Sequence, residues 1–286
     1  MKYGLTIFPT DYSIHPAELA MAAEEHGFDS LWVPEHSHFP VSPFTPGRNE
    51  GSLAAEYYDV VDPFVALAMA AQATRELRLG TSICLVVQRD PIQLAKQVAS
   101  LDALSAGRFQ FGVGGGWHPL EMANHGTAFE GRMKLLRERV QAMQAIWTEE
   151  KAEYHGAFVD FDPIYQWPKP RQKPHPPIHV GTNTPKLFHH VVAYGDGWFP
   201  IVPAGEETEA IAKLGTLHEK LEAAGRDPAT VETSIYMCPA EKQIVHGYAE
   251  AGVARVIFRL EPEPRDAVLP AIDRLAELRT RCEEGS

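Results

Sequence analysis

The chain has 286 residues, of which 44% are hydrophobic and 22% charged, and its net charge is −12. This length suits one large α/β domain with a sizeable core, and the acidic balance argues against partners such as nucleic acid or an anionic membrane, which need a basic face. Three widely spaced cysteines without a CxxC pair, no apparent signal peptide and no apolar run of membrane-spanning length lead us to expect a cytoplasmic protein without a disulfide framework.

Short apolar runs rich in β-branched residues recur along the chain and predict strands. These runs occupy residues 3–8, 29–34, the first half of 77–87, 108–113, 177–181, 197–202, 230–237 and 254–260.

A predicted helix follows each strand. Several of these helices begin with a capping residue and a proline, as at Asp62–Pro63 and Asp90–Pro91, and Gly27 and Gly107 are typical of helix ends. Alternating strands and helices predict a parallel sheet, and eight such units predict a closed (β/α)8 TIM barrel forming a single domain over residues 1–286. A doubly wound open sheet is the alternative.

Two stretches interrupt this alternation. Residues 36–62 form a long segment rich in Pro, Gly and Ser, which we expect over the barrel mouth because it follows a strand. Residues 149–176 form an insertion between the fourth helix and the fifth strand, with a predicted hairpin at 152–161.

The C-terminal ends of the strands should carry the chemistry of a barrel. The turn formed by Gly181, Thr182, Asn183 and Thr184 precedes Pro185 and a predicted helix. Its small side chains would let a phosphate reach the backbone N–H groups, although Thr184 as a simple helix cap is the alternative.

A glycine run ends the fourth strand. Gly112 to Gly116 resembles a dinucleotide fingerprint but fails it, because Trp117 stands in the place of the third glycine. We interpret Gly114, Gly115, Gly116 and Trp117 as a backbone that passes close to a flat ligand; a tight turn is the alternative.

Glu35 and His36 end the second strand, where a histidine can exchange a proton with a redox ring or substrate. His38 lies nearby, but no third ligand follows at suitable spacing, so we expect no metal site. Phe8, Trp32 and Trp117 are candidate pocket walls, with core packing favoured for Trp32. His189 and His190 are expected to be structural or solvent-facing.

Three segments together resemble the bacterial-luciferase-like family of flavin and deazaflavin oxidoreductases. They are LRLGTSICLVVQRDPIQLAKQVASLDALSAGRFQFGVGGGW at 77–117, GFDSLWVPEH at 27–36 and PPIHVGTNTPKLFHHVVAYGDGWFP at 176–200. The resemblance is close up to about residue 202 and only general beyond it. Within the family the chain is most similar to the subgroup that uses coenzyme F420.

The resemblance implies a cofactor ring at the barrel mouth, with a non-proline cis peptide at Ser82–Ile83 behind it. It places His36 near the reactive ring edge with Glu35 beside it, the phosphate at Gly181–Thr184, and Gly114–Trp117 along the ring. It implies F420 in preference to FMN, a small-molecule substrate and a homodimer.

Two positions depart from the family pattern. Trp117 stands where sugar-phosphate dehydrogenases of this family carry an acidic residue, so an apolar or aromatic substrate is the better expectation. His189 and His190 follow the phosphate turn where relatives often have arginine, for which Lys186 would compensate.

Three functions are therefore open. The first is F420-dependent hydride transfer to or from a small organic substrate, the second is an FMN-dependent monooxygenase that uses O2, and the third is flavin binding without turnover.

Overall fold

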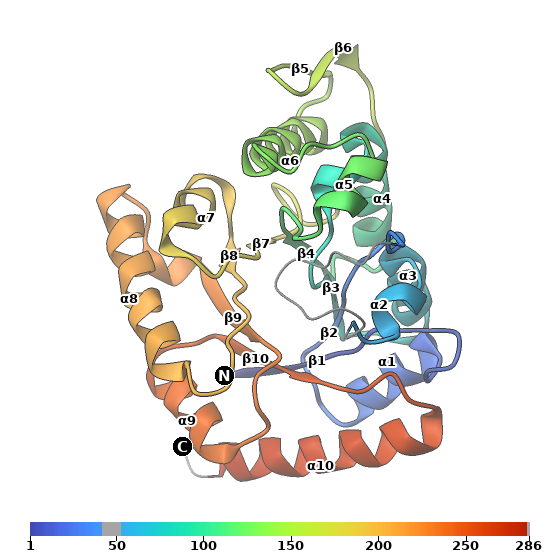
Figure 1. Ribbon diagram of the computed structural model, residues 1–286, viewed down its shortest axis with the longest axis vertical. Coiled ribbons are helices and arrows are strands. Elements are labelled where there is room, and N and C mark those ends of the chain that lie inside the picture. The colour runs from blue at the N-terminus through green and yellow to red at the C-terminus, as the bar shows by residue number, and fades with distance from the viewer. Residues whose placement is uncertain (42–52, 285–286) are drawn as a thin grey trace.

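The computed structural model describes residues 1–41 and 53–284. Parallel strands close into a barrel in the order β1-β10-β9-β8-β7-β4-β3-β2, with β1 paired to both β2 and β10 (Figure 1). The barrel prediction is confirmed and the open-sheet alternative is wrong. The strands are β1 (Lys2–Thr6), β2 (Ser30–Val33), β3 (Arg78–Thr81), β4 (Phe109–Val113), β7 (Ile178–Val180), β8 (Gly197–Trp198), β9 (Glu232–Tyr236) and β10 (Arg255–Arg259).

Helices form a ring outside these strands (Figure 1). They pack through apolar faces; on α4, for example, Leu94, Ala95 and Val98 are fully buried. The ring contains α1 (Pro16–Glu25), α3 (Pro63–Ala73), α4 (Pro91–Leu104), α6 (Arg132–Thr148), α7 (Phe188–Tyr194), α8 (Glu207–Ala223), α9 (Lys242–Glu250) and α10 (Arg265–Glu283).

The predicted helix starts are confirmed at the level of individual hydrogen bonds. Asp62 caps α3 by accepting from the N–H groups of Phe64 and Val65, and Asp90 caps α4 by accepting from that of Gln93. Proline follows each cap, at the position where a helix needs no N–H. These local signals fix where α3 and α4 begin.

Both interruptions of the barrel pattern contain structure of their own. The insertion after α6 carries the antiparallel hairpin β5 (Ala152–His155) and β6 (Asp160–Ile164), which projects beyond α6 in Figure 1. The segment after β2 includes the short helix α2 (Glu56–Asp59), and residues 42–52 of this predicted mouth loop lie outside the described residues. A further short helix, α5 (Pro119–Asn124), follows β4.

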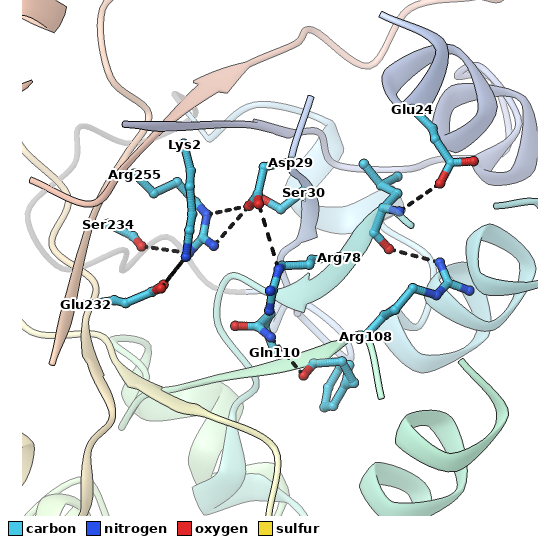
Figure 2. Close-up of polar contacts among 12 residues, drawn as sticks. Lys2, Glu24, Asp29, Ser30, Arg78, Arg108, Gln110, Glu232, Ser234 and Arg255 are labelled. Atoms are coloured by element: carbon cyan, nitrogen blue, oxygen red, sulfur yellow. Dashed lines mark hydrogen bonds and ion pairs between the residues drawn. The ribbon is translucent and has the colours of Figure 1, made fainter. Parts of the chain in front are cut away.

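A charged network closes the barrel at the N-terminal ends of the strands (Figure 2). The fully buried Arg255 bonds Asp29 at 2.9 Å and Glu232 at 3.2 Å, and Lys2 pairs with Glu232. Trp32 stacks with Arg255 inside the barrel and is fully buried, as its expected core role requires. Because the charged side chains at the N-terminal ends of the strands pair with one another, we look for a ligand site at the C-terminal ends.

Within the described part of the chain, no helix combines the length and apolarity needed to cross a bilayer.

Candidate active site

A cavity of about 460 Å³ opens at the C-terminal ends of the barrel strands. Its lining residues come from most of the strand ends around the barrel. They include every residue expected at the site: Glu35, His36, Ser82, Ile83, Gly114, Gly115, Gly116, Trp117, Gly181, Thr182, Asn183 and Thr184. Hollows of similar size lie along α10 and near Trp167, but they lie away from the strand ends on which barrel chemistry is built.

The end of β3 forms the back wall of the cavity. The peptide bond between Ser82 and Ile83 is cis, as the resemblance implied. A Cβ atom at Gly114 would lie 2.6 Å from Ile83 Cδ1, and one at Gly181 would lie 3.1 Å from Ile83 Cγ2. The Ile83 side chain therefore packs against the ends of two other strands, and positions 114 and 181 have little room for a side chain.

The glycine run after β4 is needed for close packing as well as for its turn. A Cβ atom at Gly115 would lie 2.5 Å from Met133 Sδ of α6. Gly116 has a φ of +66°, a left-handed conformation that favours glycine. Bare backbone thus forms one wall of the cavity, which fits the close approach of a flat ligand, and the tight turn is present too.

The polar turn after β7 is held in place by the next strand. The Thr182 carbonyl accepts from Trp198 Nε1 at 2.8 Å, and Asn183 Oδ1 accepts from the Ile201 N–H at 2.9 Å. Thr184 caps the 3-10 turn Pro185–Leu187 through the Lys186 N–H at 3.4 Å. The turn therefore contributes both a helix start and a rim of small polar groups.

His36 and Glu35, adjacent in sequence, have different partners. His36 Nδ1 lies 3.0 Å from Glu121 Oε2, and its ring packs against Trp117, Phe39 and Tyr57 with centroid distances of 5.2–5.9 Å. Glu35 accepts from the Leu85 N–H at 2.7 Å and from Arg89 Nε at 2.6 Å. His36 thus faces an aromatic chamber, while Glu35 holds the turn after β3.

The other residues singled out from the sequence have distinct places. Phe8 lines the cavity beside Trp117, as expected of pocket walls. His190 is buried and bonds Tyr194 Oη at 3.2 Å, and burial lowers its pKa to about 4; His189 is exposed. Among the described residues, no cluster of three or more His, Cys, Asp or Glu side chains has the geometry of a metal site.

Sequence reasoning missed three contributors to the site. Glu121 comes from α5, Tyr57 from α2, and Arg132, which begins α6, brings a guanidinium to the cavity wall beside Gly116. His118–Pro119 repeats the cap-then-proline pattern seen at Asp62–Pro63, so that signal was available for α5 and Glu121. No local pattern marks Arg132 as a pocket residue.

Comparison with known proteins adds a family and a fold. Residues 15–243 match the family model described as luciferase-like monooxygenase. An uncharacterized protein of Mycobacterium tuberculosis is 39% identical over 99% of this chain and 100% of its own length. An F420-dependent glucose-6-phosphate dehydrogenase of Mycolicibacterium gilvum is 31% identical over 76% of this chain and 62% of that protein.

Two solved structures share the fold at lower identity. A monooxygenase from Streptomyces bottropensis has a TM-score of 0.78 and 23% identity, covering 98% of this chain and 99% of its own. An F420-dependent secondary alcohol dehydrogenase has a TM-score of 0.76 and 18% identity, covering 99% of both chains. At these identities the structures support the barrel fold alone.

Proposed function

The chain belongs to the luciferase-like monooxygenase family, and we propose that it is an oxidoreductase that uses coenzyme F420 for hydride transfer to or from a small organic substrate. The observation that carries this proposal is the cavity of about 460 Å³ at the strand ends, which is lined by all the site residues expected from the sequence. A deazaflavin bound there would supply the hydride chemistry, as cofactors do in such enzymes, and the protein would supply binding, orientation and exclusion of water.

The cavity has the features that a flat cofactor with an anionic tail requires. Its volume of about 460 Å³ lies within the usual range for ligand pockets. Ile83 and the bare backbone of Gly114 to Gly116 would face the ring, and Thr182 to Thr184 with Arg132 would hold the phosphate. We favour F420 over FMN because a relative named for F420 dependence matches this chain in sequence at 31% identity.

The substrate side of the cavity favours an uncharged molecule. Trp117, Tyr57 and Phe8 bring aromatic surface beside His36, and Arg89, which lies close by, is paired with Glu35 and Asp62. A sugar phosphate would find no acidic partner at Trp117, and the Arg89 guanidinium is already paired. We therefore propose an apolar or aromatic ketone, enone or alcohol whose oxygen exchanges a proton with His36.

The two residues proposed as catalytic have different roles in this scheme. His36 touches the substrate, since its side chain borders the cavity. Glu35 has both carboxylate oxygens engaged by Arg89 and the Leu85 N–H, so we assign it to positioning of the β3 turn.

A homodimer in the cytoplasm completes the proposal. Met21 on α1 and Val65 and Met69 on α3 are 41–59% exposed, and α1 packs against α3. The three cysteines are buried, and Cys84 and Cys238 form no disulfide bond, as suits a reducing compartment.

Cofactor binding tests the central claim. At a hundredfold excess over its Kd, oxidised F420 should contribute about 2.7 kcal/mol of stability and raise the Tm by roughly 5 °C or more. Fluorescence titration and thermal unfolding with F420 and FMN in parallel measure this. Stabilisation by FMN but not by F420 would make an FMN monooxygenase the correct function, and tight F420 binding without turnover of any enone or ketone would leave a binding protein.

A further inference from the structure

Glu121 is a buried carboxylate that makes direct contact with the histidine of the cavity. Its side chain is 1% exposed, that of His36 is 7% exposed, and Oε2 lies 3.0 Å from Nδ1. The second oxygen, Oε1, accepts from the Ser37 N–H at 3.2 Å. One carboxylate therefore holds both the imidazole of His36 and the backbone that follows it.

The position of Glu121 is itself fixed by the short helix α5. The Glu121 N–H donates to Nδ1 of His118, the N-terminal cap of α5, at 3.1 Å. Burial lowers the pKa of His118, so this ring is neutral near pH 7 and its Nδ1 is free to accept. The carboxylate thus projects from an anchored turn and not from a loose loop.

The ionisation of Glu121 decides which proton His36 carries. Burial by itself raises the pKa of Glu121, but the hydrogen bond and the charge contributed by His36, together with the Ser37 N–H, outweigh burial and leave the pKa below its ordinary value. An ionised carboxylate only accepts hydrogen bonds, so Nδ1 of His36 must be the donor.

His36 lines the cavity, and its other ring nitrogen is Nε2. Among the described residues Nε2 has no hydrogen-bond partner, and the ring is held between Trp117, Phe39 and Tyr57. The titratable groups around it are Glu121 and His118 from α5, His38 from its own loop and Tyr57 from α2.

We propose that Glu121 is a positioning residue that fixes His36 in the tautomer with hydrogen on Nδ1, so that Nε2 is the atom that exchanges a proton with the substrate. In one direction Nε2 takes the proton of a substrate hydroxyl, and in the other the imidazolium returns a proton to a carbonyl oxygen. The carboxylate stabilises the imidazolium that forms, in the way an aspartate supports histidine in hydrolytic triads. This inference rests on the proposed function for its substrate, but not for the His36–Glu121 pair.

The tautomer is measured directly in the cofactor-free protein. Long-range proton–nitrogen correlation spectra of the wild-type protein should show neutral His36 with its hydrogen on Nδ1, whereas free histidine favours Nε2. In Glu121→Ala the hydrogen should move to Nε2. A wild-type His36 protonated on Nε2 would overturn the proposal, and this readout requires neither a folded variant nor F420 binding.

Glu121→Gln then separates charge from shape. The amide keeps an acceptor for Nδ1 but carries no charge, so it cannot stabilise the imidazolium. With an active substrate, kcat should fall about 100-fold while KM and the Kd for F420 change by less than about threefold.

The matched control is Glu232→Gln, which removes another ion-paired carboxylate at the opposite end of the barrel (Figure 2). It should lower stability and leave the His36 tautomer and kcat unchanged. If Glu121→Gln behaves in the same way as this control, Glu121 is merely structural and the proposal is wrong. If His36 carries its hydrogen on Nδ1 as expected but F420 does not bind, the proposed function fails and the role of the His36–Glu121 pair stands.

Discussion

At the scale of single residues, the barrel depends on positions where a methyl group would meet backbone. A Cβ atom at Gly112 on β4 would lie 1.9 Å from the Thr81 carbonyl oxygen of β3. That oxygen belongs to the neighbouring strand and cannot move aside as a flexible side chain can. By contrast, a Cβ atom at Gly215, on the exposed face of α8, would lie within 4 Å of no atom in the described residues other than its chain neighbours and the adjacent backbone of that helix.

The two glycines therefore predict opposite effects of the same substitution. Gly112→Ala should destabilise the protein by about 3 kcal/mol, since backbone must shift inside a packed barrel. Gly215→Ala should stabilise it by about 0.5–1 kcal/mol, because alanine is the better helix former. Urea unfolding of both variants measures the difference, and equal effects would refute this account.

At the scale of elements, a side chain of α1 organises the start of β3. Glu24 Oε1 accepts from the N–H groups of Arg75, Glu76 and Leu77 at 3.0, 2.6 and 2.7 Å. Burial raises the pKa of Glu24, but these backbone hydrogen bonds lower it by a larger amount. The pKa of Glu24 therefore lies below its ordinary value. The carboxylate thus links a helix end to the turn that leads into the next strand.

This link predicts a pH-dependent contribution to stability. Glu24→Gln should cost about 1.5–3 kcal/mol at neutral pH, where the wild-type carboxylate is ionised. Because the folded pKa is depressed, the advantage of the wild type is complete above the unfolded pKa and is lost as the pH falls through the folded value. Chemical unfolding at neutral pH and at about pH 3 should show the difference shrinking.

The neighbouring Glu25 provides the control for this measurement. It is exposed on the same helix, so Glu25→Gln should change stability by less than about 0.5 kcal/mol at either pH. A pH-independent cost of Glu24→Gln would mean that the carboxylate charge is not responsible.

At the scale of the whole molecule, the exposed apolar residues of α1 and α3 are the surface we assign to the proposed homodimer. Val65 is 59% exposed and Met69 41% exposed, while Phe64 and Leu67 of the same helix are buried against the barrel. The helix is therefore apolar on both sides, which a solvated barrel helix does not require.

Charge on this face should separate the subunits. We expect the wild type to sediment as a dimer and the double variant Val65→Glu, Met69→Glu to sediment as a monomer with its barrel intact, because two buried charges would meet their symmetric copies. Leu104→Lys, at a residue 85% exposed on α4, should leave the dimer unchanged. A monomeric wild type would refute the assignment.

By itself, the amino-acid sequence predicted the order of strands and helices and a closed barrel, because caps, prolines, glycines and apolar periodicity act over a few residues. The cavity positions Ser82 and Ile83 came from its resemblance to a known family. The sequence did not reveal Glu121 as the partner of His36, 85 residues away, nor the engagement of Glu35 by Arg89. Only the tertiary structure decided those pairings, because barrel closure brings together side chains whose complementarity in charge and distance leaves no local pattern in the chain.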